Sequence, residues 1–120
     1  MIKKTLIVGS GFMGTSIALA LKSDNISCVE QNSDYLKIIR NLNIYKNLYR
    51  GIDEVDKDFD LIIICSRQKE AFNHIINFSK KFPSAVITDI SSSKEFLIDN
   101  NLPRNFISSH PICGSHKTGP

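Results

Sequence analysis

The sequence predicts an α/β fold, in which a doubly wound parallel sheet is covered by helices on both faces to give a single three-layer domain. Three observations lead to this prediction. Short apolar runs alternate with segments of about ten residues whose apolar side chains recur at helical spacing. A turn rich in glycine joins the first run to the first helical segment. No linker, internal repeat or low-complexity tract divides residues 1–120, so we expect one domain.

The expected strands and helices follow one another along the chain. We place strands at 4–8, 27–30, 48–49, 61–65, 85–88 and 106–107, and helices at 12–22, 34–42, 69–81 and 93–100. The run 61–65 is continuously apolar, which is typical of a strand buried on both faces, and we expect it at the centre of the sheet. Ser33 is expected to cap the second helix. The apolar side of that helix is formed by Leu36, Ile38, Ile39 and Leu42.

Composition and charge exclude several classes of protein. The chain has 42% apolar and 22% charged residues, as a globular domain does, and a formal net charge of +3 from scattered lysines rather than a basic stripe. We therefore expect no nucleic-acid partner. The longest apolar run, 61–65, is too short to cross a membrane. The cysteines lack disulfide spacing and no signal-peptide cleavage site follows Lys3 and Lys4, so we expect a cytoplasmic protein.

The stretch VGSGFMG carries Gly9, Gly11 and Gly14 in the spacing G-x-G-x-x-G. It follows a predicted strand and opens a predicted helix, which is the context of a dinucleotide-binding turn in a Rossmann-type fold. Gly9 would allow the tight turn, Gly11 would let a pyrophosphate approach the backbone, and Gly14 would let the helix pack closely on the strand. We also expect Phe12 and Met13 to contact the cofactor, because the start of a helix favours phosphate binding.

An acidic residue ends the second predicted strand. Glu30 lies about twenty residues after Gly9, where dinucleotide-binding domains carry a carboxylate for the ribose hydroxyls. A carboxylate there repels a 2′-phosphate, and the residues that follow, 31–33, include no arginine. The sequence therefore predicts NAD rather than NADP as the cofactor.

Polar residues follow the later strands, where the carboxyl ends of parallel strands form the ligand crevice. Ser66 and Asp89 each lie at the end of a predicted strand, and we expect both to contact the cofactor. His110 follows the last predicted strand and is a candidate acid or base, because its unperturbed pKa lies near neutral pH. Cys113 and His116 could join His110 as metal ligands, but no fourth ligand is near in sequence, so we expect no metal site.

Two strings near the end of the sequence, TDISSSKEFL and FISSHPICGSHKTGP, resemble the paired signature of the prephenate dehydrogenase family, which includes arogenate dehydrogenases. The string IVGSGFMGTSIALALK resembles the glycine turn of the same family, so the resemblance covers the whole chain. It implies the NAD-dependent oxidative decarboxylation of prephenate to 4-hydroxyphenylpyruvate in tyrosine biosynthesis. It also implies that His110 accepts the proton of the ring hydroxyl and that Ser92 shares this hydrogen-bond network. Ser115 and Lys117 would lie in the loop that contacts the substrate.

The resemblance further implies a second, helical domain, which completes the substrate site and forms a homodimer in this family. Residues 1–120 do not include that domain, so we expect this chain alone to be inactive or weakly active. Other readings stay open at this point. The chain could act on arogenate instead, it could be a relative of β-hydroxyacid dehydrogenases, or it could be an NAD-binding module without catalysis.

Overall fold

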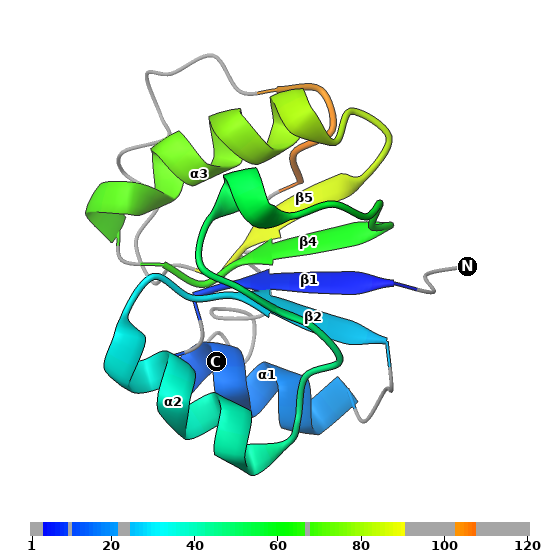
Figure 1. Ribbon diagram of the computed structural model, residues 1–120. Coiled ribbons are helices and arrows are strands. Elements are labelled where there is room, and N and C mark those ends of the chain that lie inside the picture. The colour runs from blue at the N-terminus through cyan, green and yellow to red at the C-terminus, as the bar shows by residue number, and fades with distance from the viewer. Residues whose placement is uncertain (1–3, 10, 22–24, 67, 91–102, 108–120) are drawn as a thin grey trace, which may run out of the picture.

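The computed structural model describes residues 4–9, 11–21, 25–66, 68–90 and 103–107. These residues form strands and helices in the alternating order that the sequence predicts (Figure 1). In chain order the elements are β1 (Thr5–Val8), α1 (Phe12–Leu21), β2 (Ile26–Val29), α2 (Ser33–Leu42), β3 (Leu48–Tyr49), the short 3-10 helix η1 (Ile52–Glu54), β4 (Leu61–Ile64), α3 (Gln68–Lys81) and β5 (Val86–Asp89).

The described strands are all parallel and form one sheet in the order β3-β2-β1-β4-β5. β1 is in the middle, where Ile7 lies beside Cys28 of β2 on one side and beside Ile63 of β4 on the other. The chain winds outward from β1 to β3 and then returns to β4, so the winding reverses between β1 and β4. This arrangement confirms the doubly wound α/β fold. The expectation that 61–65 is the central strand is wrong, because β4 lies between β1 and β5.

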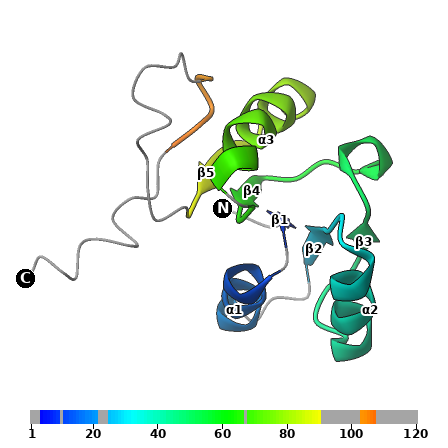
Figure 2. The same cartoon turned by 90° about the vertical axis from the view of Figure 1, so that its left-hand side faces the viewer.

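Side chains that alternate along the strands build one core on each face of the sheet. On one face, Leu6 of β1 packs in a cluster with Ile75 and Phe78 of α3. On the other face, Ile7 of β1 packs in a cluster with Ala18 of α1 and with residues of α2. Figure 2 shows the resulting layers, with α3 on one side of the sheet and α1 and α2 on the other. The strands in the middle of the sheet are therefore covered on both faces, which explains why β1 and β4 consist almost entirely of apolar residues.

The N-cap of α2 is Asn32. Its side-chain oxygen accepts hydrogen bonds from the backbone N–H groups of Asp34 at 2.9 Å and of Tyr35 at 3.1 Å. The prediction that Ser33 is the cap is wrong by one residue. Both residue types can accept such bonds, and the extended backbone of Asn32 (φ −78°, ψ 118°) places the start of the helix directly after it.

The apolar side of α2 is narrower than the sequence predicts. Leu36 and Ile39 are buried in the same cluster as Cys28 of β2, whereas Ile38 and Leu42 are 55% and 52% exposed. A helix that touches the core along one narrow stripe buries residues three positions apart and leaves the flanking positions in water. The expectation for Ile38 and Leu42 is therefore wrong.

The last predicted strand contributes a single bridge beside β5. Phe106 pairs in parallel with Ile87, and the N–H of Ile107 donates to the carbonyl of Ile87 at 2.7 Å. This segment extends the described sheet by one bridge only, and the predicted helix at 93–100 lies outside the described residues.

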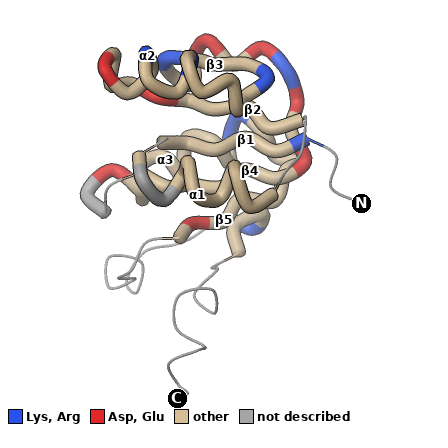
Figure 3. Tube along the Cα trace, turned by 90° about the horizontal axis from the view of Figure 1, so that it is seen from below, with Lys and Arg blue, Asp and Glu red and all other residues tan. Residues whose placement is uncertain are grey.

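Charged side chains are distributed over the described part of the chain. Figure 3 shows lysine and arginine interspersed with aspartate and glutamate along the trace, without a continuous basic stripe in the part described. None of the described helices is both long enough and apolar enough to cross a lipid bilayer.

We predict that Asn32→Ala lowers the free energy of unfolding by about 1 kcal/mol, because two N–H groups in the first turn of α2 lose their acceptor. Ser33→Ala is the matched control, with an expected change of less than about 0.5 kcal/mol. Urea unfolding followed by circular dichroism measures both changes. A larger loss for Ser33→Ala than for Asn32→Ala would contradict the assignment of the cap.

Candidate functional site

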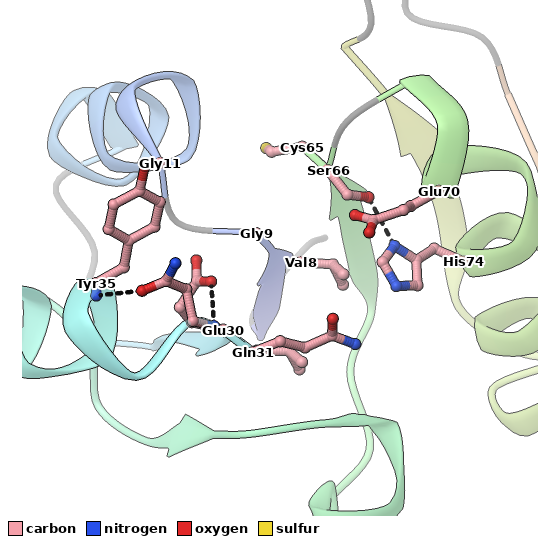
Figure 4. Close-up of a pocket in the computed structure, with 12 residues that line it drawn as sticks. Val8, Gly9, Gly11, Glu30, Gln31, Tyr35, Cys65, Ser66, Glu70 and His74 are labelled. Atoms are coloured by element: carbon pink, nitrogen blue, oxygen red, sulfur yellow. Dashed lines mark hydrogen bonds between the residues drawn. The ribbon is translucent and has the colours of Figure 1, made fainter.

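A cavity of about 460 Å³ opens at the carboxyl ends of β1, β2 and β4. It lies where the winding of the sheet reverses, which is where open α/β sheets bind ligands. Figure 4 shows side chains from these strand ends and from α2 and α3 around the cavity. The lining residues are Val8, Gly9, Gly11, Val29, Glu30, Gln31, Asn32, Tyr35, Cys65, Ser66, Glu70 and His74.

Gly9 makes the turn that leaves β1. Its φ of 94° lies in the left-handed region, where residues with a Cβ are strained. A Cβ at this position would also lie 3.2 Å from backbone atoms of Cys65 and Ser66. The N–H of Gly9 donates to the carbonyl of Val29 at 2.8 Å and so joins the turn to β2. Both the backbone angle and the available space therefore require glycine here.

The lack of a side chain matters for different reasons at the other two glycines of the motif. A Cβ on Gly14 would overlap the carbonyl oxygen of Gly9, so α1 can pack this closely on the turn only with glycine. Tyr45 supports the same place, because its hydroxyl donates to the carbonyl of Gly14 at 3.4 Å. Gly11, in contrast, lines the cavity, and none of the described atoms lies within 4 Å of the place of a Cβ. The space at Gly11 is thus open to a ligand.

Helix α1 begins at Phe12, directly after Gly11, so its first turn lies at the cavity. The first N–H groups of a helix have no intrahelical partner, and the helix dipole makes this end positive. A helix start in this position can therefore hold the oxygens of a pyrophosphate. The side chains of Phe12 and Met13 lie outside the described part of the structure, so their expected contacts with a cofactor stay predictions.

Glu30 follows β2 and lines the cavity although only 7% of it is exposed. Its Oε2 accepts a hydrogen bond from the N–H of Asn32 at 2.9 Å, and its own N–H donates to the carbonyl of Tyr49 at 2.8 Å. These bonds fix the backbone and the carboxylate at the wall of the cavity. The structure thus brings Glu30 together with Gly9 and Gly11 in one site.

The wall across the cavity from Glu30 is polar as well (Figure 4). Ser66, which follows β4, has its Oγ 2.6 Å from Nδ1 of His74 on α3. The His74 ring packs edge-on against Phe78, with the ring centroids 6.1 Å apart. Burial lowers the pKa of His74, and the carboxylate of Glu70 partly opposes this shift. The net effect favours the neutral form of the ring.

Glu70 and His74 also line the cavity, although no sequence motif indicated them. They lie four positions apart in the helix that follows Ser66, which places them one turn apart on the same helix face. This spacing was visible in the sequence, but such pairs are common on helix surfaces. Only the packing of α3 on the sheet shows which face of the helix reaches the cavity.

Cys65 and Asp89 lie at neighbouring strand ends but have different surroundings. Burial raises the pKa of the Cys65 thiol to about 12, and the carboxylate of Asp89 adds to this shift. The thiol lines the cavity in its protonated form, which is a weak nucleophile. Asp89 is fully buried and is not among the lining residues, so its expected contact with a cofactor stays a prediction.

The remaining candidates lie outside the described part of the chain. They are Ser92, His110, Cys113, Ser115, His116 and Lys117. The roles expected for Ser92, His110, Ser115 and Lys117 in catalysis and substrate binding stay predictions. Within the described residues, no group of three or more histidine, cysteine, aspartate or glutamate side chains could hold a metal ion.

The chain resembles known proteins over most of its length. Residues 17–120 match the family model described as prephenate dehydrogenase, nucleotide-binding domain. The prephenate dehydrogenase of Lactococcus lactis subsp. cremoris is 30% identical over 129 residues, which cover 98% of this chain and 36% of that protein. The crystal structure of Synechocystis arogenate dehydrogenase has the same fold, with a TM-score of 0.67 at 16% identity, and the match covers 80% of this chain and 35% of that one. The chain thus spans little more than a third of each of these proteins.

We predict that Gly14→Ala destabilises the fold by about 1 kcal/mol or more, because the new Cβ must displace the carbonyl of Gly9. Gly11→Ala is the matched substitution in the same motif and is expected to change stability by less than about 0.5 kcal/mol. Thermal and urea unfolding measure both variants. Equal destabilisation by the two substitutions would show that the space at Gly11 is not open.

Proposed function

The chain belongs to the prephenate dehydrogenase family, and we propose that it binds NAD in the cavity at the ends of β1, β2 and β4. The single observation that carries this proposal is the position of Glu30 in the same cavity as Gly9 and Gly11. In this arrangement the start of α1 holds the pyrophosphate, and the carboxylate of Glu30 accepts hydrogen bonds from the adenosine ribose.

The charges around the cavity favour NAD over NADP. The lining includes the carboxylates of Glu30 and Glu70, and none of the described lining residues is lysine or arginine. A 2′-phosphate beside Glu30 would bring like charges together, which is unfavourable. The ribose of NAD instead offers two hydroxyl donors that the carboxylate can accept.

For the whole enzyme, the proposed reaction is the oxidative decarboxylation of prephenate to 4-hydroxyphenylpyruvate. When bound, NAD supplies the nicotinamide ring that accepts a hydride from the carbon bearing the ring hydroxyl. His110 accepts the proton of that hydroxyl, and Ser92 belongs to the same hydrogen-bond network. Carbon dioxide leaves, and the ring becomes aromatic. The support for these roles is the likeness of the strings around Ser92 and His110 to the family signature, together with the family match over 17–120.

The substrate contacts are assigned to Ser115 and Lys117, within the same string that contains His110. The helical domain of the family would complete the substrate site and form a homodimer. Prephenate and arogenate differ in the side chain that this second domain would bind. An assay of the chain joined to such a domain, with each substrate in turn, distinguishes the two.

The role of Glu30 gives a test of cofactor choice. Glu30→Gln is expected to weaken NADH binding about tenfold or more, because hydrogen bonds to a charged acceptor are stronger than those to a neutral amide. NADPH binding should weaken less, since the substitution also removes a charge that repels the 2′-phosphate. Nicotinamide fluorescence measures both affinities. Asp34→Asn, which removes a nearby carboxylate outside the cavity lining, is the control, and an equal loss for NADH and NADPH in Glu30→Gln would exclude the proposed role.

The role of His110 gives a test of the reaction. In a protein that joins this chain to the helical domain, His110→Asn should lower kcat by roughly 10²–10⁴-fold, because the hydroxyl proton loses its acceptor. The affinity for NADH should stay the same. His116→Asn, which changes a histidine in the same string, is the control. A steady-state assay in which His110→Asn keeps its turnover would remove His110 from the mechanism.

A further inference from the structure

The hydroxyl of Ser66 is held from two sides at the edge of the cavity. The backbone of Ser66 packs closely against Gly9. A Cβ added to Gly9 would lie 3.2 Å from the N and Cα atoms of Ser66. Its Oγ lies 2.6 Å from Nδ1 of His74, whose ring is supported by Phe78. Because both Ser66 and His74 line the cavity, the pair is in a position to act on a bound ligand.

The Ser66 oxygen and Nδ1 of His74 share a hydrogen bond whose direction depends on the tautomer of the ring. A separation of 2.6 Å is a short hydrogen-bond distance. In the tautomer that carries its proton on Nε2, His74 accepts the hydrogen bond of the Ser66 hydroxyl at Nδ1. With its proton used in this way, the Ser66 oxygen offers only lone pairs to the cavity.

The position of Ser66 in the cavity determines which part of a bound dinucleotide lies next to its hydroxyl. A phosphate has only acceptors at neutral pH, whereas a ribose hydroxyl can donate to the Ser66 oxygen. The adenosine ribose is at Glu30 beyond β2, and β4 lies on the opposite side of β1. A dinucleotide that crosses β1 at its pyrophosphate would therefore bring its second ribose to Ser66.

We propose that His74 is a positioning residue, which orients the Ser66 hydroxyl so that its oxygen accepts a hydrogen bond from the nicotinamide-side ribose. This inference rests on the proposed binding of NAD in the cavity. It adds His74, which lies within α3 rather than in the glycine turn or at a strand end, to the parts of the fold that recognise the cofactor.

The test compares Ser66→Ala, His74→Leu and the double variant in the 120-residue chain. Each single variant should bind NADH and ADP-ribose about three- to tenfold more weakly, because one hydrogen bond is lost. The double variant should bind no more weakly than the single ones, since His74 acts only through Ser66. AMP lacks the second ribose, so its affinity should be unchanged in all variants, which also shows that they are folded.

A conservative variant separates positioning from simple packing. In His74→Asn the amide oxygen can take the place of Nδ1 as acceptor, so NADH affinity should stay within about twofold of the unaltered chain. Heteronuclear NMR of the histidine ring should show the proton of His74 on Nε2, and Ser66→Ala should shift the Nδ1 signal.

The outcomes separate this inference from the proposed function. Unchanged NADH affinity in His74→Leu, or an equal loss for AMP, overturns the role of His74 alone. A proton on Nδ1 overturns it as well. If the unaltered chain binds none of these ligands, both the inference and the proposed function are wrong.

Discussion

The site depends on the close packing of Gly9 between the start of α1 and the end of β4. A Cβ on Gly14 would overlap the carbonyl of Gly9, and a Cβ on Gly9 itself would lie 3.2 Å from the backbone of Ser66. The glycine turn and the end of β4, which are distant in sequence, therefore approach each other closely at their backbones. This packing places the first turn of α1, the carboxylate of Glu30 and the hydroxyl of Ser66 around one cavity, so the shape of the cavity follows from the sizes of two glycines.

The electrostatics of the cavity complement this geometry. The positive end of α1 faces the space beside Gly11, while Glu30 on one wall and Glu70 on the other supply carboxylate acceptors. A ligand that has an anionic centre flanked by hydroxyl groups suits this pattern, and a dinucleotide without a 2′-phosphate has that composition. The family match and the cavity thus agree, although they rest on different observations.

Much of the fold was predictable from the sequence. The strands are short, mainly apolar runs, and the helices have apolar residues that recur at helical spacing. The failures have local physical causes. Asn32 and Ser33 are equally able to cap a helix, and only the backbone angles of Asn32 decide between them. Among the site residues, Gly9, Gly11 and Glu30 were recognisable because backbone geometry and strand ends fix their places. His74 was not recognisable, because its contact with Ser66 depends on how α3 is rotated against the sheet.

The central claim is that a nicotinamide dinucleotide binds at the carboxyl ends of β1, β2 and β4. Amide NMR of the chain during titration with NADH tests it most directly. We expect saturable shifts at Gly9, Gly11, Glu30 and Ser66, with little change around the smaller cavity at the other end of the strands, which is lined in part by Lys4, Lys46 and Asn47. Shifts centred on that second cavity, or no saturable shifts at the glycine turn, would contradict the claim.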